Sequence, residues 1–359
     1  MHVPDGFIDL PVSAAAVSAA AGAVAVSLRG ARKELGGTSH AGGYGGDRTA
    51  PLAGLVAAFI FAVQMLNFPV AAGTSGHLLG GALAAILVGP YTGVLCVSVV
   101  LLLQGVLFAD GGLTALGVNI TVMGVVTVVV AYALFRGLVK VLPKRRSSVT
   151  AASFVAALVS VPAAATAFTF IYAIGGTTDV PIRTVLTAMV GVHVLIGIGE
   201  AVITAATVGA VMAVRPDLVY GARGLSAPLK LRVGGELVDA EPSSPTPSSP
   251  ASTRPVWIAG LVTSLLLAGF VSFYASASPD GLEKVAADKG IDEKVEDHAA
   301  ADSPLADYGV KDVENVRVAG GLAGVIGVGA TVAVGSGVFW AVKRRRHDEP
   351  ATVAPKETV

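Results

Sequence analysis

Residues 78–108 read LLGGALAAILVGPYTGVLCVSVVLLLQGVLF and contain no charged side chain. About 20 apolar residues cross a bilayer as a helix, so these 31 residues are too long for one ordinary span. Gly89 and Pro90 interrupt the run near its middle, and this pair is typical of the end of a helix. The stretch therefore predicts two crossings that meet at Gly89-Pro90, and the first, Leu78–Val88, would be a half-length helix of roughly 16 Å.

Charge placement supports this double crossing. Lys and Arg collect between the apolar runs, and the positive-inside rule assigns such clusters to the cytoplasm. Arg29–Lys33 and Lys140–Arg146 lie on one side of the membrane only if residues 78–108 cross twice. The other runs of spanning length lie near Leu10–Leu28, Leu52–Val70, Thr114–Val139, Val149–Ile174, Thr184–Val214, Val256–Tyr274 and Val318–Val342.

These runs predict an all-α polytopic membrane protein. The first seven spans would form a seven-helix bundle, and two additional transmembrane helices would follow it. The basic clusters place the N-terminus outside the cytoplasm and the C-terminus in the cytoplasm.

Composition excludes several other classes of protein. Of the 359 residues 53% are hydrophobic and 14% are charged, far from the pattern of a soluble domain. The 25 basic and 25 acidic residues cancel, which excludes a nucleic-acid binder that works by bulk positive charge. The single cysteine, Cys96, excludes a disulfide framework and a Cys-rich metal site. The chain has no nucleotide-binding loop, so the energy for any driven process must come from another subunit or from a gradient.

Composition also divides the chain. Residues 241–255 read EPSSPTPSSPASTRP, a Pro/Ser tract that cannot pack a core. We predict a seven-span domain at residues 1–232, a cytoplasmic linker at 233–255, a two-span module at 256–346 and a cytoplasmic tail at 347–359. Residues 275–316, between the last two spans, hold eleven acidic residues and four Lys. This external segment either concentrates cations by electrostatic focusing or is only a soluble loop.

The N-terminal sequence, MHVPDGFIDLP (residues 1–11), does not resemble a signal peptide. It lacks a basic n-region, since the first basic side chain after His2 is Arg29. A bulky second residue also discourages removal of Met1. We therefore expect Met1 to keep a free amine on the outer side of the membrane.

A free amine followed by His offers three nitrogens to a metal ion: the Met1 amine, the His2 amide and the His2 Nδ1. They close a five-membered and a six-membered chelate ring and fill three corners of a square, an arrangement that suits nickel(II), copper(II) or low-spin cobalt. His77 lies on the same predicted side and could supply the fourth nitrogen. Two plainer interpretations stay open: His2 as an ordinary surface residue, and His77 as a helix cap.

Other polar residues lie at or near membrane depth. His193 and Glu200 are seven residues apart on one predicted span and share a helix face, either as a hydrogen-bonded structural pair or as metal ligands. The structural interpretation is favoured, because the four corners are supplied elsewhere. Asn67, Ser75 and Asn119 are expected as hydrogen-bonding groups around the site. The turn at Asp110 is interpreted as a helix connection rather than a ligand.

The same motifs resemble a known family. MHVPDGFID (1–9), NFPVAAGTSGHLLGG (67–81) and FADGGLTALGVNITVMGVV (108–126) resemble the CbiM/NikM family, and GVHVLIGIGEAVIT (191–204) lies within a resemblance that covers residues 1 to about 225. PDGLE at residues 279–283 resembles a CbiN/NikN-type accessory module fused behind the linker. Val122 departs from the pattern, since a second polar residue is expected near Asn119.

The resemblance implies a location in a prokaryotic cell membrane and a function. The family comprises the substrate-binding (S component) subunits of energy-coupling-factor importers, a class of ABC transporter, for cobalt(II) or nickel(II). It implies metal binding by Met1, His2 and His77, with cobalt for cobalamin biosynthesis as the preferred cargo and nickel as the alternative. It also implies a membrane coupling (T) subunit and cytoplasmic ATP-binding subunits as partners, with no enzymatic activity in this chain and no organic cofactor.

Two other functions are kept as alternatives. One is a metal carrier that acts alone and is driven by an ion gradient. The other is a membrane enzyme or sensor whose chemistry depends on His193 and Glu200.

Overall fold

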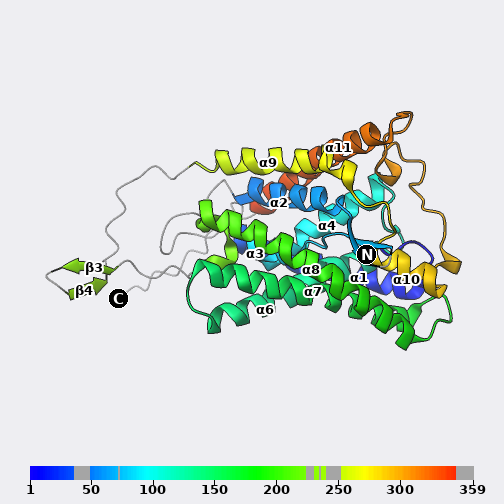
Figure 1. The fold of residues 1–359 in the computed structure, drawn as a ribbon, viewed down its shortest axis with the longest axis horizontal. Coiled ribbons are helices and arrows are strands. Elements are labelled where there is room, and N and C mark those ends of the chain that lie inside the picture. The colour runs from blue at the N-terminus through cyan, green and yellow to red at the C-terminus, as the bar shows by residue number, and fades with distance from the viewer. Residues whose placement is uncertain (36–48, 72, 224–229, 234–235, 240–251, 345–359) are drawn as a thin grey trace, which may run out of the picture.

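The computed structural model describes residues 1–35, 49–71, 73–223, 230–233, 236–239 and 252–344. Long helices run side by side along the longest axis of the molecule (Figure 1). Seven helical segments of the described chain are long and apolar enough to cross a membrane. Five of them are single helices: α1 (Leu10–Leu35), α4 (Pro90–Leu107), α7 (Arg146–Gly175), α8 (Ile182–Val214) and α11 (Val316–Arg344). The sixth is continuous through α5 (Leu116–Asn119), a π-helical turn (Ile120–Val126) and α6 (Thr127–Val141). The seventh is α9 (Arg254–Gly269) with the 3₁₀ turn Val271–Tyr274. The predicted all-α polytopic membrane fold is confirmed.

Two further apolar helices are shorter. α2 (Thr49–Gln64) has 16 residues, and α3 (Gly81–Val88) has 8 residues, all of them buried. The predicted half-length helix therefore begins at Gly81 rather than at Leu78. Residues 77–80 instead form neither helix nor strand, and Gly80 has a left-handed backbone with a φ of 85°. The side chains that hold this stretch are described below with the site.

The junction of α3 and α4 lies where the sequence predicts it. Gly89 has a φ of 102°, which a residue with a Cβ rarely adopts, and so ends α3. Pro90 begins α4, where its missing N–H costs no hydrogen bond. The buried carboxylate of Glu34, near the end of α1, accepts hydrogen bonds from Thr92 N at 2.7 Å and Tyr91 N at 3.2 Å. This contact caps α4 and ties it to α1.

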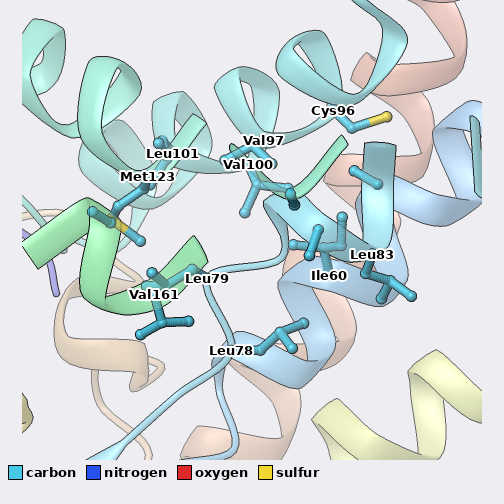
Figure 2. Packing of buried hydrophobic residues seen from close by; sticks show 14 of the residues in the cluster. Ile60, Leu78, Leu79, Leu83, Cys96, Val97, Val100, Leu101, Met123 and Val161 are labelled. Carbon is cyan, nitrogen blue, oxygen red and sulfur yellow. The ribbon is translucent and has the colours of Figure 1, made fainter. Parts of the chain in front are cut away.

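The core lies around α3. Figure 2 shows Leu78 and Leu79 on the stretch before α3 and Leu83 on α3 among buried side chains of neighbouring helices. All three leucines are at most 1% exposed. α3 and the stretch before it are therefore surrounded by protein and do not face lipid.

Two hairpins were not predicted. α2 ends at Gln64, and β1 (Phe68–Ala71) pairs antiparallel with β2 (Thr74–Gly76), so the predicted span Leu52–Val70 is too long at its C-terminal end. The physical reason is Pro69, which disfavours helix at the residue before it and cannot donate a backbone hydrogen bond. A second hairpin joins β3 (Lys230–Val233) and β4 (Glu236–Asp239) at the predicted start of the linker. Residues 240–251 of the linker and the predicted tail at 347–359 lie outside the described residues.

The last two long helices pack on α2. A Cβ added to Gly327 of α11 would lie 2.1 Å from the Phe61 ring on α2, and one added to Gly324 would lie 2.3 Å from the Ala268 carbonyl oxygen on α9. The glycines of α11 thus permit close helix contact, because they carry no side chain at the interface.

The segment between α9 and α11 folds over the end of the bundle where the chain begins. Figure 1 places its helix α10 (Gly281–Lys289) beside the N-terminus. The remaining short 3₁₀ turns are Pro216–Leu218, Tyr220–Ala222, Asp292–Lys294 and Ala306–Tyr308. The acidic segment is therefore partly helical and packs on the first domain.

Candidate metal centre

The first residues of the chain turn into the bundle. Met1 is 2% exposed and Val3 is fully buried. The Asn119 side chain holds Val3 at both of its backbone groups: Val3 N donates to Asn119 Oδ1 at 2.8 Å, and Asn119 Nδ2 donates to Val3 O at 3.0 Å. Gly112 N donates to the same carbonyl at 2.9 Å. These contacts fix Val3 and therefore the positions of Met1 and His2, which directly precede it.

A second anchor lies two residues further along. The buried carboxylate of Asp5 accepts hydrogen bonds from Thr114 N at 2.8 Å and Leu113 N at 3.2 Å. Asp5 thereby caps the turn that precedes α5. The N-terminal segment and residues 111–119 form one hydrogen-bonded unit.

The nitrogens that the sequence singles out lie together. The Met1 amine is 2.6 Å from His77 Nε2, and the rings of His2 and His77 have centroids 5.1 Å apart. Adjacent corners of a square with metal–nitrogen bonds of about 2.0 Å are about 2.8 Å apart, so the amine and Nε2 have nearly that spacing. His2 Nδ1 is buried and has no hydrogen-bond partner among the described residues. The arrangement brings Met1, His2 and His77 to one point.

The stretch before α3 orients His77. His77 Nδ1 donates to Leu78 O at 3.0 Å, which leaves Nε2 as the acceptor that faces the Met1 amine. Glu200 of α8 accepts from Leu79 N at 2.5 Å and Gly80 N at 3.0 Å. Gln64 Nε2 at the end of α2 donates to Leu79 O at 3.0 Å. Glu200 and Gln64 therefore hold the backbone that carries His77, and these bonds explain why α3 begins only at Gly81.

His193 and Glu200 are both fully buried but do not bond to each other. His193 Nδ1 donates to Met189 O at 2.7 Å, one turn earlier on α8. His193 Nε2 has no partner among the described residues. The expectation of a hydrogen-bonded pair is therefore wrong: Glu200 bonds to the backbone before α3, and His193 bonds to the backbone of its own helix.

The sequence did not single out Asp280, from the PDGLE motif. Asp280 Oδ2 lies 2.6 Å from the Met1 amine and 3.5 Å from His77 Nε2. Its Oδ1 accepts from Leu282 N at 2.7 Å and Glu283 N at 2.9 Å, while Glu283 Oε2 accepts from Asp280 N. This reciprocal pair is a capping box at the start of α10. The Asp–Gly–Leu–Glu spacing signals the cap, but nothing local signals the contact with Met1.

Ser75 and Asn67 join the second module to the first. Ser75 N donates to Pro279 O at 2.8 Å, and its hydroxyl donates to Ser278 O at 2.7 Å. Asn67 O accepts from Ser276 N at 2.7 Å. Both residues lie near the site as expected, but they hold residues 276–279 rather than a metal-binding side chain.

Burial and charge set the protonation of the site. Burial lowers the pKa of the His2 imidazole to about 4, against the opposing effect of Asp110, so the ring is neutral at neutral pH. Burial alone would raise the pKa of Asp280, but the Met1 ammonium and His77 hold it well below its usual range. The site therefore contains a neutral imidazole beside a buried ion pair.

No group of three or more His, Cys, Asp or Glu side chains in the described parts of the chain is arranged to hold a metal ion. A metal at this point would therefore need the main-chain nitrogens of Met1 and His2. A cavity of about 780 Å³ lies beside them and is lined by His2, His77, Asn67 and Asp280, among others.

Comparison with known proteins gives matches in both parts of the chain. Residues 2–218 match the CbiM family, described as a cobalt uptake substrate-specific transmembrane region, and residues 254–344 match the PDGLE domain. A protein of Haloquadratum walsbyi, provisionally named a metal transport protein, is 39% identical over 61% of this chain and 94% of its own length.

Two further relatives and a solved structure agree. A protein of Archaeoglobus fulgidus, provisionally named a fused nickel transport protein NikMN, is 37% identical over 61% of this chain and 68% of its own. A cobalt transport protein CbiM of Sorangium cellulosum is 33% identical over 47% of this chain and 76% of its own. A crystal structure of a transition metal transporter superposes with a TM-score of 0.51 and 26% identity, over 60% of this chain and 93% of that one. The relatives are named as transport proteins rather than enzymes, and the chain belongs to the CbiM family of cobalt and nickel transport membrane proteins, with a PDGLE domain behind the CbiM region.

Proposed function

We propose that this chain binds cobalt(II) or nickel(II) through four nitrogens: the Met1 amine, the His2 amide, His2 Nδ1 and His77 Nε2. The observation that carries the proposal is the 2.6 Å separation of the Met1 amine from His77 Nε2, with the buried and unpartnered His2 Nδ1 beside them. The proposal takes Met1 as the first residue of the mature protein, because an extension would convert the amine into an amide.

Binding exchanges protons for the metal. The amine must lose a proton and the His2 amide must lose its hydrogen before both can coordinate. The ion pair between the Met1 ammonium and Asp280 cannot persist when the amine lone pair is on the metal. Metal binding therefore releases protons and changes how the PDGLE segment is held.

The chemical class of cargo follows from the donor set. Four nitrogens in a plane favour nickel(II), copper(II) and low-spin cobalt over magnesium or calcium, which prefer oxygen. Between the two transported metals we propose cobalt for cobalamin biosynthesis as the cargo, with nickel as the alternative.

We further propose that the chain is the substrate-binding subunit of an energy-coupling-factor importer, with a membrane coupling subunit and ATP-binding subunits as partners. The description of the family as substrate-specific supports a division of labour between subunits. The domain division at residues 232, 255 and 346 is supported by the separate matches of the two regions.

The orientation is part of the proposal. Basic residues occupy the last turns of helices that end far from the metal centre: Arg32 and Lys33 in α1, Lys140 in α6, and Lys343 and Arg344 in α11. By the positive-inside rule these ends lie in the cytoplasm and the metal centre lies on the outer side.

Metal analysis of purified protein tests the metal site. The wild type should retain one cobalt or nickel ion, and His77→Ala should lose it while keeping its thermal unfolding midpoint in the absence of metal. His298→Ala is the matched control, because His298 Nε2 donates to Gly111 O at 3.1 Å and lies outside the proposed nitrogen square. Equal metal content in all three proteins would contradict the proposal.

Uptake by liposomes separates the transport mechanisms. An importer subunit should accumulate metal only when its partner subunits and ATP are present. Uptake driven by an ion gradient with this chain alone would establish the carrier alternative instead.

A further inference from the structure

The cavity beside the metal centre carries negative charge. Its lining includes the carboxylates of Asp110, Asp280, Glu283 and Asp307 and one guanidinium, that of Arg317. A divalent cation is therefore drawn into it. His2 also lines this cavity, so the cavity is a route by which a cation can reach the imidazole.

Asp110 is held by one of its two oxygens. The Tyr308 hydroxyl donates to Asp110 Oδ2 at 2.5 Å and accepts from Gln104 Nε2 at 2.9 Å. No described residue donates a hydrogen bond to Asp110 Oδ1. The second module, which contributes Tyr308, thus fixes one oxygen of this carboxylate and leaves the other available.

The free oxygen faces an unpartnered nitrogen. Asp110 Oδ1 lies 3.4 Å from His2 Nδ1, whose side chain is 8% exposed and which forms no hydrogen bond within the described chain. Both residues line the cavity. A buried nitrogen without a hydrogen bond and a fixed carboxylate oxygen that faces it at this distance indicate a place for a ligand.

We propose that Asp110 Oδ1 and His2 Nδ1 form a capture site that binds the incoming divalent metal ion before it enters the nitrogen square. Two atoms 3.4 Å apart can both bind one ion at bond lengths of about 2.0–2.1 Å, with an angle at the metal of about 110°. Water completes the coordination shell of the captured ion, as oxygen ligands do for hydrated divalent cations.

The order of events follows from availability. His2 Nδ1 and Asp110 Oδ1 face each other without a hydrogen bond to any described residue, whereas the Met1 amine is paired with Asp280 and His77. The ion therefore binds first to the free pair and then passes to the amine and the amide as they lose protons. Asp110 no longer coordinates the metal once four nitrogens surround it. Asp110 is therefore a ligand during entry and not in the final complex.

This inference rests on the proposed metal site, and kinetics separate the two. Consider a side chain that binds the metal ion only on its way to the nitrogen square. Removing this side chain changes the association and dissociation rate constants by the same factor and leaves Kd unchanged. Purified full-length protein in detergent would be mixed with nickel(II) chloride in a stopped-flow instrument, with the absorbance of the nitrogen-bound nickel as the signal. Dissociation would be followed with an excess of chelator.

Asp110→Asn keeps an oxygen that accepts from Tyr308 but removes the carboxylate charge. We expect both rate constants to fall about tenfold, with Kd unchanged within about twofold. Asp307→Asn is the matched control, because it removes the same charge from the same cavity; we expect less than a twofold change.

Three results would overturn the inference while wild-type protein still binds nickel. The rates of Asp110→Asn could equal those of the wild type, its dissociation could become faster at an unchanged association rate, or Asp307→Asn could slow association as much as Asp110→Asn does. Failure of the wild type to bind nickel at all would instead overturn the proposed function.

Discussion

Replacing Asn119 with Ala tests whether the folded N-terminal segment is what creates metal affinity. The change removes both hydrogen bonds that Asn119 forms with Val3, at 2.8 and 3.0 Å. Val3 O keeps its bond from Gly112 N, but Val3 N is left buried without a partner. A buried unpaired donor costs about 1–3 kcal/mol and the second lost bond about 1 kcal/mol.

A total of about 3 kcal/mol predicts a loss of about 100-fold in metal affinity, because the metal must then also order residues 1–3. Competition titration with a chelator of known affinity measures the change. Thr121→Val is the matched control. Among the described residues its hydroxyl bonds only to Gly117 O, one turn earlier in its own helix, and we expect less than a threefold change. An Asn119→Ala protein with wild-type affinity would refute the view that a preformed N-terminal segment supports binding.

Three further predictions concern the same site. Gly111→Ala should unfold at lower temperature and bind metal about tenfold more weakly, since Gly111 has a φ of 80° and an added Cβ would lie 2.9 Å from Asn119 Nδ2. Gly73→Ala is its control, because Gly73 has a φ of 73° but open space around it. This control should show only the backbone strain of about 1–2 kcal/mol. Because the pKa of His2 is lowered to about 4, the unfolded chain binds more protons than the native protein below about pH 6.5, so the metal-free protein should lose up to about 3 kcal/mol of stability as pH falls toward 4. Denaturant titrations should show a smaller loss in His2→Gln, and an equal pH dependence would contradict the buried neutral imidazole. Asp280→Asn removes the charge that holds the Met1 ammonium, so it should tighten metal binding up to about tenfold while making residues 276–289 more accessible to protease; weaker binding would mean that Asp280 supports the metal.

Much of the architecture is predictable from local sequence. Gly89 and Pro90 separate two apolar runs, and the structure ends α3 and begins α4 at these residues. The start of α3 is not predictable in this way. Leu78–Gly80 are as apolar as the helix that follows. They stay outside it because Gln64 of α2 and Glu200 of α8 bond to the backbone of Leu79 and Gly80.

The residues of the metal centre also differ in whether local sequence predicts them. Met1 and His2 are adjacent in sequence, so their chelating geometry follows from the peptide itself. His77 can be associated with them because it is predicted to lie on the same side of the membrane. Asp280 is 279 residues from Met1, and no periodicity or spacing connects the two. Such contacts become visible only when the second module is placed on the first.

The second module is therefore more than an external acidic loop. Its Asp280 contacts the Met1 amine, its Tyr308 holds Asp110, and residues near Glu296 pack on Gly6, with Glu296 N donating to Asp5 O at 3.1 Å. Net charge alone would favour a solvated segment that collects cations. Specific hydrogen bonds instead attach it to the residues that surround the metal centre.

X-ray absorption of the nickel-loaded protein tests the central claim most directly. The account predicts a four-coordinate, square-planar nickel(II) ion with nitrogen ligands only, one of the two imidazoles disappearing from the spectrum in His77→Ala. A six-coordinate ion with oxygen ligands, or a sulfur ligand from the Met1 side chain, would contradict it.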